Sequence, residues 1–162
     1  MEEPGRATTA NADERLVRRF IGEVLVARRL EVAAELFSQD VVDHQAGGAR
    51  HGVQELTKSV RGFLRAFPDL AIAVNVMAVV PPITMAWLSW HGTHEQSFLG
   101  VPATGRRVSA GCVSIFRSSG GRLAERWEFV DVSTRKQLGL PRPASPWSQL
   151  SSRDRPLLRV RW

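Results

Sequence analysis

Residues 108–132, VSAGCVSIFRSSGGRLAERWEFVDV, contain the hairpin that decides the fold. Apolar and β-branched residues alternate with others from Val108 to Arg117 and from Leu123 to Val132, which predicts two strands. Ser118-Ser-Gly-Gly121 lies between them and has the small residues of a tight turn. This stretch therefore predicts an antiparallel hairpin.

Two further strands precede the hairpin. Leu70–Val80 and Ile83–His91 are rich in alternating Ala, Ile and Val, and Pro81-Pro82 separates them. The loop from Gly100 to Gly105 then makes a wider connection to the hairpin. Four strands joined by successive hairpins predict an antiparallel, strongly bent sheet.

The first part of the chain has helical periodicity instead. Helices are expected over Asp13–Arg28, Leu30–Phe37 and Val53–Phe67, and Pro68 ends the third. Leu56, Val60 and Phe63 belong to the apolar stripe of that third helix and are expected in the core. Three N-terminal helices on one face of a curved antiparallel sheet give an α+β fold that can enclose a cone-shaped cavity.

The chain of 162 residues fits one domain, which we place at residues 13–140. Residues 1–12 are small and polar and are expected to be disordered. Residues 141–162 form a tail rich in proline and arginine, either disordered or laid over a neighbouring surface.

The net charge of +6 does not indicate nucleic-acid binding, because the tail contributes five arginines against one aspartate. Cys112 is the single cysteine and cannot form an internal disulfide. The sequence shows neither a secretory leader nor an apolar run of the ~20 residues that a membrane span needs. We therefore expect a cytoplasmic protein that binds neither nucleic acid nor membrane.

The acidic residues of the last strand are the first candidates for chemistry. Counting by two places Leu123, Glu125, Trp127, Phe129 and Asp131 on one face. A carboxylate beside aromatic rings in a dry cavity has a raised pKa, which suits Asp131 to general acid/base catalysis. The alternative is that Asp131 caps a short helix beginning near Ser133. Glu128, which lies on the opposite face unless the strand bulges, is the reserve candidate.

Histidines are the second group of candidates. His91 and His94 are three residues apart, so they point to opposite faces of a regular strand. His94 is expected in the site, where its imidazole bonds Asp131 or a substrate carbonyl; the alternative is a strand-end histidine bonded to the backbone. His91 is a reserve candidate. His44 is either a substrate contact or part of a solvated loop.

Aromatic and apolar side chains are expected to line the pocket and suit a flat, hydrophobic, oxygenated ligand. The predicted substrate-binding residues are Trp87, Phe98, Trp127 and Phe129, with His44 at the entrance. The spacing of the histidines predicts no metal site. The sequence has no glycine-rich phosphate loop and no lysine on the predicted sheet, so no cofactor is expected.

Short motifs along the chain resemble a known family when they are taken in order. They are Arg18-Arg19-Phe20, Glu35-Leu-Phe37, Val42-Asp-His44, Phe67-Pro-Asp-Leu70, Gly92-Thr-His94, Phe98-Leu-Gly-Val-Pro102, Thr104-Gly-Arg-Arg107, Trp127 with Asp131, and Gln137-Leu-Gly139. Their order and spacing resemble the SnoaL-like polyketide cyclases, which have the nuclear transport factor two-like fold.

The resemblance implies a cofactor-free enzyme that closes a ring of a polyketide by intramolecular aldol condensation, with a carboxylate as acid/base. It implies that the family pattern places His94 in the cavity and His44 near its entrance. Relatives catalyse other reactions on this scaffold, so an isomerase, a hydrolase, a hydroxylation partner and a non-catalytic binding protein stay open. A homodimer or a higher homo-oligomer is expected through the exposed sheet face, with Val113, Ile115 and Leu88 in contact.

Overall fold

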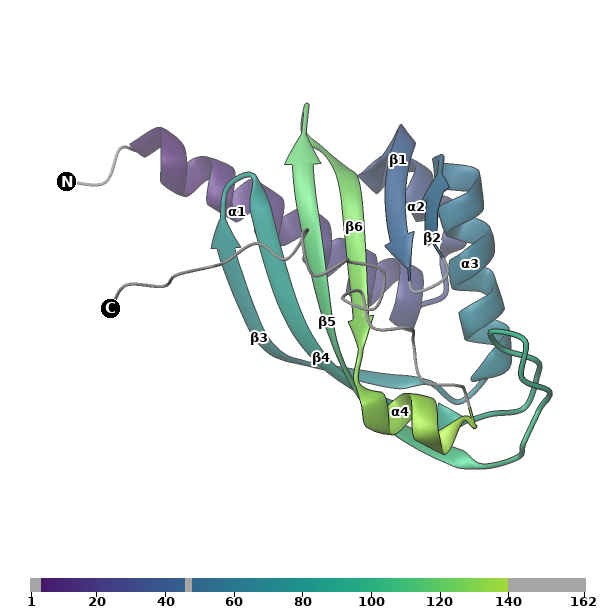
Figure 1. The fold of residues 1–162 in the computed structure, drawn as a ribbon. Helices are drawn as coiled ribbons and strands as arrows, with labels where there is room; N and C mark the ends of the chain where they lie inside the picture. The colour runs from purple at the N-terminus through teal and green to yellow at the C-terminus, as the bar shows by residue number, and fades with distance from the viewer. Residues whose placement is uncertain (1–3, 46–47, 140–162) are drawn as a thin grey trace, which may run out of the picture.

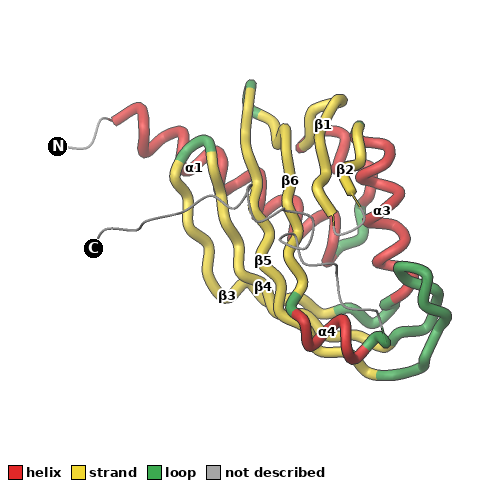
Figure 2. The backbone as a smooth tube through the Cα atoms, viewed as in Figure 1, coloured by secondary structure: helices red, strands yellow, loops and turns green. Residues whose placement is uncertain are grey.

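The computed structural model describes residues 4–45 and 48–139. Helices cover one face of a six-stranded curved sheet, and a short helix lies at the lower end of the other face (Figures 1 and 2). The helical segments are α1 (Pro4–Arg19), η1 (Phe20–Val26), η2 (Leu30–Val32), α2 (Ala33–Leu36), α3 (Val53–Ala66) and α4 (Val132–Gln137). The strands are β1 (Phe37–Gln45), β2 (Gly48–His51), β3 (Ala71–Val80), β4 (Ile83–Thr93), β5 (Arg107–Ser119) and β6 (Arg122–Val130).

The predicted α+β class is confirmed, and the four predicted strands are found as β3 to β6. Two further strands were missed. The order in the sheet is β2-β1-β6-β5-β4-β3, and β1 pairs with β6 in parallel, so the sheet is mixed and not purely antiparallel. We expected Phe37 to end a helix and Asp43 to lie beyond it in a loop; both lie in β1, because Val41 and Val42 favour extended backbone.

The expectation of disorder at the N-terminus was wrong for the residues that are described. Helix α1 begins at Pro4, although we expected residues 1–12 to be disordered. Proline is tolerated at the first position of a helix, and Ala10 and Ala12 have high helix propensity. Residues 1–3 and the tail at 141–162 lie outside the described residues.

We call the sheet face under the helices the inner face and the opposite face the outer face. On β5 every second residue is buried against the helices, from Val108 to Ser118. Phe20, Phe37 and Phe116 form an edge-to-face cluster in the core, with ring centroids 5.1 and 5.8 Å apart. Among the described residues no helix is long and apolar enough to cross a membrane.

A bulge in β6 determines which side chains reach the inner face. Along β5 the partner of Arg117 is Glu125, but the partner of the next residue, Ser118, is Leu123, so Ala124 is an extra residue in β6. Leu123 points inward, and one extra residue reverses the alternation beyond it. Glu125, Trp127 and Phe129 therefore point outward. Arg126 and Glu128 point inward.

Candidate functional site

The residues predicted for the site divide between the two faces of the sheet. Register with β5 places Trp127 and Phe129 on the outer face, opposite Ile115 and Val113. Trp87 and His91 are exposed on the outer face of β4, and His44 lies on the outer face of β1. His94, Glu128 and the half-buried Phe98 lie on the side of the core.

Asp131 is the N-cap of α4, and its environment is the reverse of the one expected. Its Oδ1 accepts hydrogen bonds from the backbone N–H of Thr134 at 2.7 Å and from the hydroxyls of Ser133 and Thr134 at 2.7 and 3.0 Å. Its Oδ2 accepts the backbone N–H of Gly111 at 2.9 Å. The side chain therefore joins α4 to β5.

These bonds also overturn the expected raised pKa. Partial burial acts to raise the pKa of Asp131, but the four donors favour the charged form and lower it to about 2. The residue is exposed on the outer face. A carboxylate in this environment is ionised at neutral pH and serves as a helix cap.

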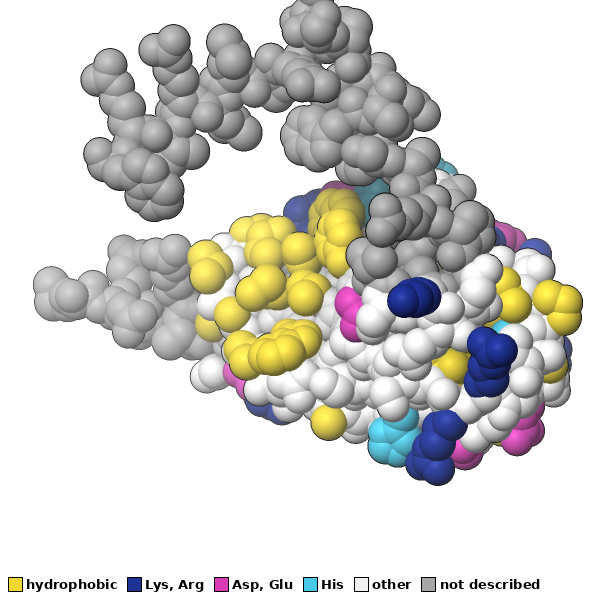
Figure 3. Space-filling view, turned by 60° about the horizontal axis from the view of Figure 1, so that its bottom comes forward, with side chains coloured by type: hydrophobic (Ala, Val, Ile, Leu, Met, Phe, Trp, Pro, Cys, Tyr) yellow, Lys and Arg dark blue, Asp and Glu magenta, His cyan; other side chains and the backbone are white. Residues whose placement is uncertain are grey.

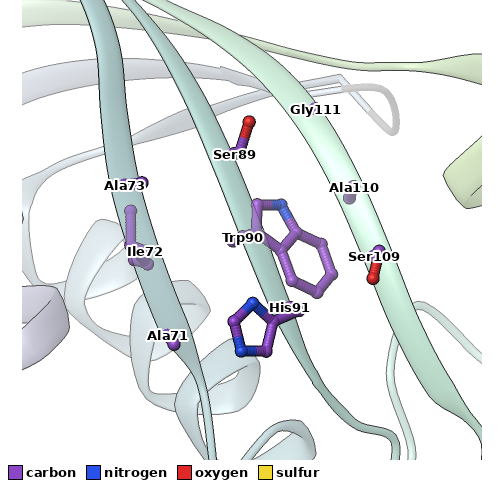
Figure 4. A pocket seen from close by; sticks show the side chains of 9 residues that line it. All are labelled: Ala71, Ile72, Ala73, Ser89, Trp90, His91, Ser109, Ala110 and Gly111. Atoms are coloured by element: carbon purple, nitrogen blue, oxygen red, sulfur yellow. The ribbon is translucent and has the colours of Figure 1, made fainter.

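A shallow groove of about 460 Å³ lies on the outer face, across β3, β4 and β5 (Figure 4). It is lined by Ala71, Ile72, Ala73, Ser89, Trp90, His91, Ser109, Ala110 and Gly111. Figure 4 shows His91 and the two serines around this shallow surface. Trp87 and Asp131 border it at Gly111, where a Cβ atom would lie 3.8 Å from Trp87 Nε1 and 3.3 Å from Asp131 Oδ2.

The three predicted histidines lie in three different environments. His91 is exposed, whereas His94 is fully buried, so the two point to different sides of the sheet as expected. The His94 ring stacks on Phe67 at 5.4 Å and its Nδ1 lies 3.1 Å from the Thr104 hydroxyl. Its buried Nε2 has no hydrogen-bond partner among the described residues.

His44 lies in a cluster on the outer face. Its ring stacks on Trp127 with the planes 2° from parallel and the centroids 4.8 Å apart. Its Nε2 lies 3.1 Å from Glu125, whose pKa is lowered by the Arg117 guanidinium and then by His44. His44 is therefore on the face opposite Glu128.

The inner face holds a polar network that the sequence analysis did not assemble. Arg126 donates to both carboxylate oxygens of Asp43, at 2.8 and 3.2 Å. Both side chains are buried, with 7% and 1% of their surfaces exposed. The Ser114 hydroxyl donates to Glu128 at 2.8 Å, and the Arg126 guanidinium lies 3.9 Å from the same carboxylate.

The charges in this network also act on Cys112. Burial, followed by the negative charge of Glu128, raises the pKa of the Cys112 thiol, so it stays protonated as expected of an inert packing residue. Burial acts to lower the pKa of Arg126, but Glu128 and Asp43 outweigh it and raise the pKa. Within the described residues no group of three His, Cys, Asp or Glu side chains has the arrangement of a metal site.

The local sequence pattern does not reveal this network. Arg126 and Glu128 alternate with the outer aromatic residues of β6, and Asp43 follows two β-branched residues. A charged pair at alternate positions of a strand is expected on the solvent face. Only a buried partner for the arginine makes the inward orientation favourable.

The sequence match to a family model decides to which protein family this chain belongs. The family model for SnoaL-like polyketide cyclases matches residues 15–138. The chain belongs to the SnoaL-like polyketide cyclase family. A comparison with curated proteins finds no match.

Solved structures agree with this assignment. A protein from Jannaschia sp. CCS1, named as a SnoaL-like polyketide cyclase, has a TM-score of 0.77 and 20% identity over 87% of this chain and 98% of its own. IdmH from Streptomyces antibioticus, named as a polyketide cyclase, has a TM-score of 0.66 and 25% identity over 79% and 99%. TsrD from Streptomyces laurentii has a TM-score of 0.71 and 20% identity over 81% and 97%. The SnoaL-like fold predicted from the sequence is thus confirmed.

Proposed function

We propose that this SnoaL-like protein is a cofactor-independent cyclase that closes a ring of a polyketide-like substrate by an intramolecular aldol reaction. Glu128 is the proton-transfer residue. The observation that supports it is the position of this carboxylate, which lies on the inner face, 25% exposed, with a hydrogen bond from Ser114. Val130, two residues further along the same face, is 40% exposed, so solvent and small molecules approach from this end of β6.

The reaction needs only one proton to be removed and returned. The Glu128 carboxylate takes a proton from an acidic carbon between two carbonyl groups, which leaves an enolate. The enolate carbon attacks a ketone of the same molecule, and the alkoxide that forms takes the proton back from Glu128. Folding the substrate so that the two carbons meet supplies much of the rate, since orientation is worth ~7–11 kcal/mol.

Asp131 is not assigned this role, although the sequence favoured it. Its two oxygens already accept four hydrogen bonds, and a carboxylate with a pKa of about 2 is too weak a base to take a proton from carbon. A general base works best with a pKa near the operating pH. Asp131 therefore has a structural role, because it holds α4 against β5.

His94 and Phe98 are not assigned to the Glu128 site. Glu128 lies across β5 from Ala86, and His94 is eight residues further along the chain from Ala86, about 26 Å at ~3.3 Å per residue. His44, Trp87, Trp127, Phe129 and His91 lie on the outer face and are not assigned to this interior site.

The test is turnover of aromatic poly-β-ketone esters, with products separated by chromatography and identified by NMR. Glu128→Gln is expected to lower kcat by at least ~100-fold, the usual contribution of a general acid/base, with the substrate Kd unchanged. Glu125→Gln is the matched control, because Glu125 lies on the same strand and the opposite face. Binding without turnover by the unaltered protein would support a binding protein instead, and equal loss in both variants would remove Glu128 from the mechanism.

The outer face is proposed to bind a second copy of the chain. Its exposed apolar side chains gather over β3, β4 and β6 (Figure 3), each at least 37% exposed: Val76, Val80, Ile83, Met85, Trp87 and Phe129. A standard interface buries about 800 Å² per partner, and this patch with the half-buried Val113 and Ile115 supplies its apolar centre. Leu88, which we expected there, is buried in the core.

A twofold contact would place the same patch on both subunits. Sedimentation velocity is expected to show a dimer that Trp87→Lys converts to monomer, whereas Arg50→Glu, at an exposed site on β2, leaves it intact. A monomeric unaltered protein at micromolar concentration would contradict this proposal.

A further inference from the structure

Arg126 lies between two carboxylates on the inner face but bonds only one of them. Its Nε donates to Asp43 Oδ1 at 2.8 Å and an Nη donates to Asp43 Oδ2 at 3.2 Å, whereas the Glu128 carboxylate is 3.9 Å from its other Nη. The Phe20 ring, whose centroid lies 5.6 Å from the guanidinium carbon, packs against the same group. The guanidinium is therefore held on the side of β1.

Asp43 is itself fixed. The amide of Gln45 donates to its Oδ2 at 2.7 Å, and register pairs Asp43 directly with Arg126 across the parallel β1–β6 contact. The carboxylate thus meets the guanidinium through two hydrogen bonds, a geometry stronger than a single contact. Asp43 thus takes both of the carboxylate hydrogen bonds that Arg126 makes, and Glu128 keeps only a 3.9 Å contact with the guanidinium.

We infer that Asp43 is a positioning residue for Glu128: by holding the Arg126 guanidinium, it keeps that cation from closing onto the Glu128 carboxylate, which stays open to a substrate. This inference rests on the proposed role of Glu128. Without Asp43 a buried guanidinium has no partner, and an unpaired buried charge is unfavourable. Glu128, only 3.9 Å away, is the carboxylate that would then bind it.

The experiment compares Glu128→Gln in two backgrounds and needs no substrate. In the unaltered protein this change removes only the 3.9 Å contact between Glu128 and Arg126, which has no hydrogen bond, and the expected shift in Tm is below about 2 °C. In the Asp43→Asn background the same change is expected to lower Tm at least twice as much, because Arg126 has moved onto Glu128. Equal shifts in both backgrounds would overturn the inference.

Spectroscopy separates positioning from a purely structural role. The ¹³Cδ resonance of Glu128, assigned by its loss in Glu128→Gln, is expected to move in Asp43→Asn but not in Asp40→Asn, the matched control at an exposed position of β1. A resonance that stays in place in a folded Asp43→Asn variant would contradict the proposed movement of Arg126.

A second measurement applies if Asp43→Asn does not fold. Slow hydrogen exchange of the Arg126 Nε–H, which depends on Asp43, is expected to survive Glu128→Gln in the otherwise unaltered protein. Loss of that protection would show that Arg126 rests on Glu128 and would refute the inference. These results are independent of turnover, so a failure of the proposed cyclase activity is recognised separately by the kinetic test.

Discussion

Replacement of Asp131 by alanine tests how this residue acts, because the structure makes it a stability element of the outer face. The change removes the N-cap of α4 and the acceptor for the Gly111 N–H together. The shift of the Asp131 pKa from 3.8 to about 2 corresponds to a stabilisation of roughly 2.4 kcal/mol, since one pKa unit is worth 1.36 kcal/mol. The residue is exposed, so solvent screening reduces this to about 1–1.5 kcal/mol, close to the usual cost of losing an N-cap.

The dependence on pH follows from the direction of the shift. The folded pKa of Asp131 lies below its ordinary value, so its contribution is complete above about pH 5 and is lost as the pH falls from 3.8 toward 2. Thermal unfolding followed by circular dichroism is expected to show a Tm about 3–6 °C lower for Asp131→Ala at pH 7. The difference should narrow steadily below pH 4.

Two comparisons make this prediction specific. Asp131→Asn keeps one acceptor oxygen for the cap and is expected to lie between the alanine variant and the unaltered protein. Asp40→Ala, at an exposed position of β1, is the control for loss of one negative charge. A Tm for Asp131→Ala equal to that of the unaltered protein at pH 7, or a difference that widens toward pH 3, would refute the reasoning.

Three further outcomes are expected from the described contacts. Arg126→Met leaves Asp43 buried without its cation and is expected to lower the free energy of unfolding in urea by about 3–5 kcal/mol. The double variant Arg126→Met with Asp43→Leu is expected to lose clearly less. Equal losses in the two variants would argue against the buried pair. Gly92→Ala places a Cβ 3.1 Å from Phe67 Cβ and is expected to lower the free energy of unfolding by about 1–3 kcal/mol. An unchanged midpoint of urea unfolding would contradict this close approach. Cys112, buried and with a raised pKa, should react with iodoacetamide at least ~100-fold more slowly in the folded than in the urea-unfolded protein, and similar rates would show that it is accessible.

The kinds of element were determined by local sequence. A period of 3.6 predicted the helix at 53–67, which ends at Ala66, and a period of two predicted the hairpin of β5 and β6. The same period of two placed His91 and His94 on different sides of the sheet. These features depend on neighbours within a few residues, and for that reason the sequence alone predicts them.

Tertiary structure decided which side chains of β6 point to the inner face. The alternation of the sequence placed Leu123 on one face with Glu125, Trp127 and Phe129. The bulge at Ala124 leaves Leu123 inward but turns the other three outward and brings Glu128 inward. A bulge has no strong local signature, because its position depends on how β6 pairs with its neighbours. The reserve candidate therefore replaced Asp131 in the proposed site.

The partner of Arg126 also depended on the fold. Asp43 lies 83 residues earlier in the chain, and the parallel pairing of β1 with β6 sets the two side chains opposite each other. No local pattern contains that pairing. The sequence by itself thus determined which segments are helices and strands, whereas long-range strand register determined which charges are buried together, since an inward arginine is stable only where a carboxylate from a distant strand meets it.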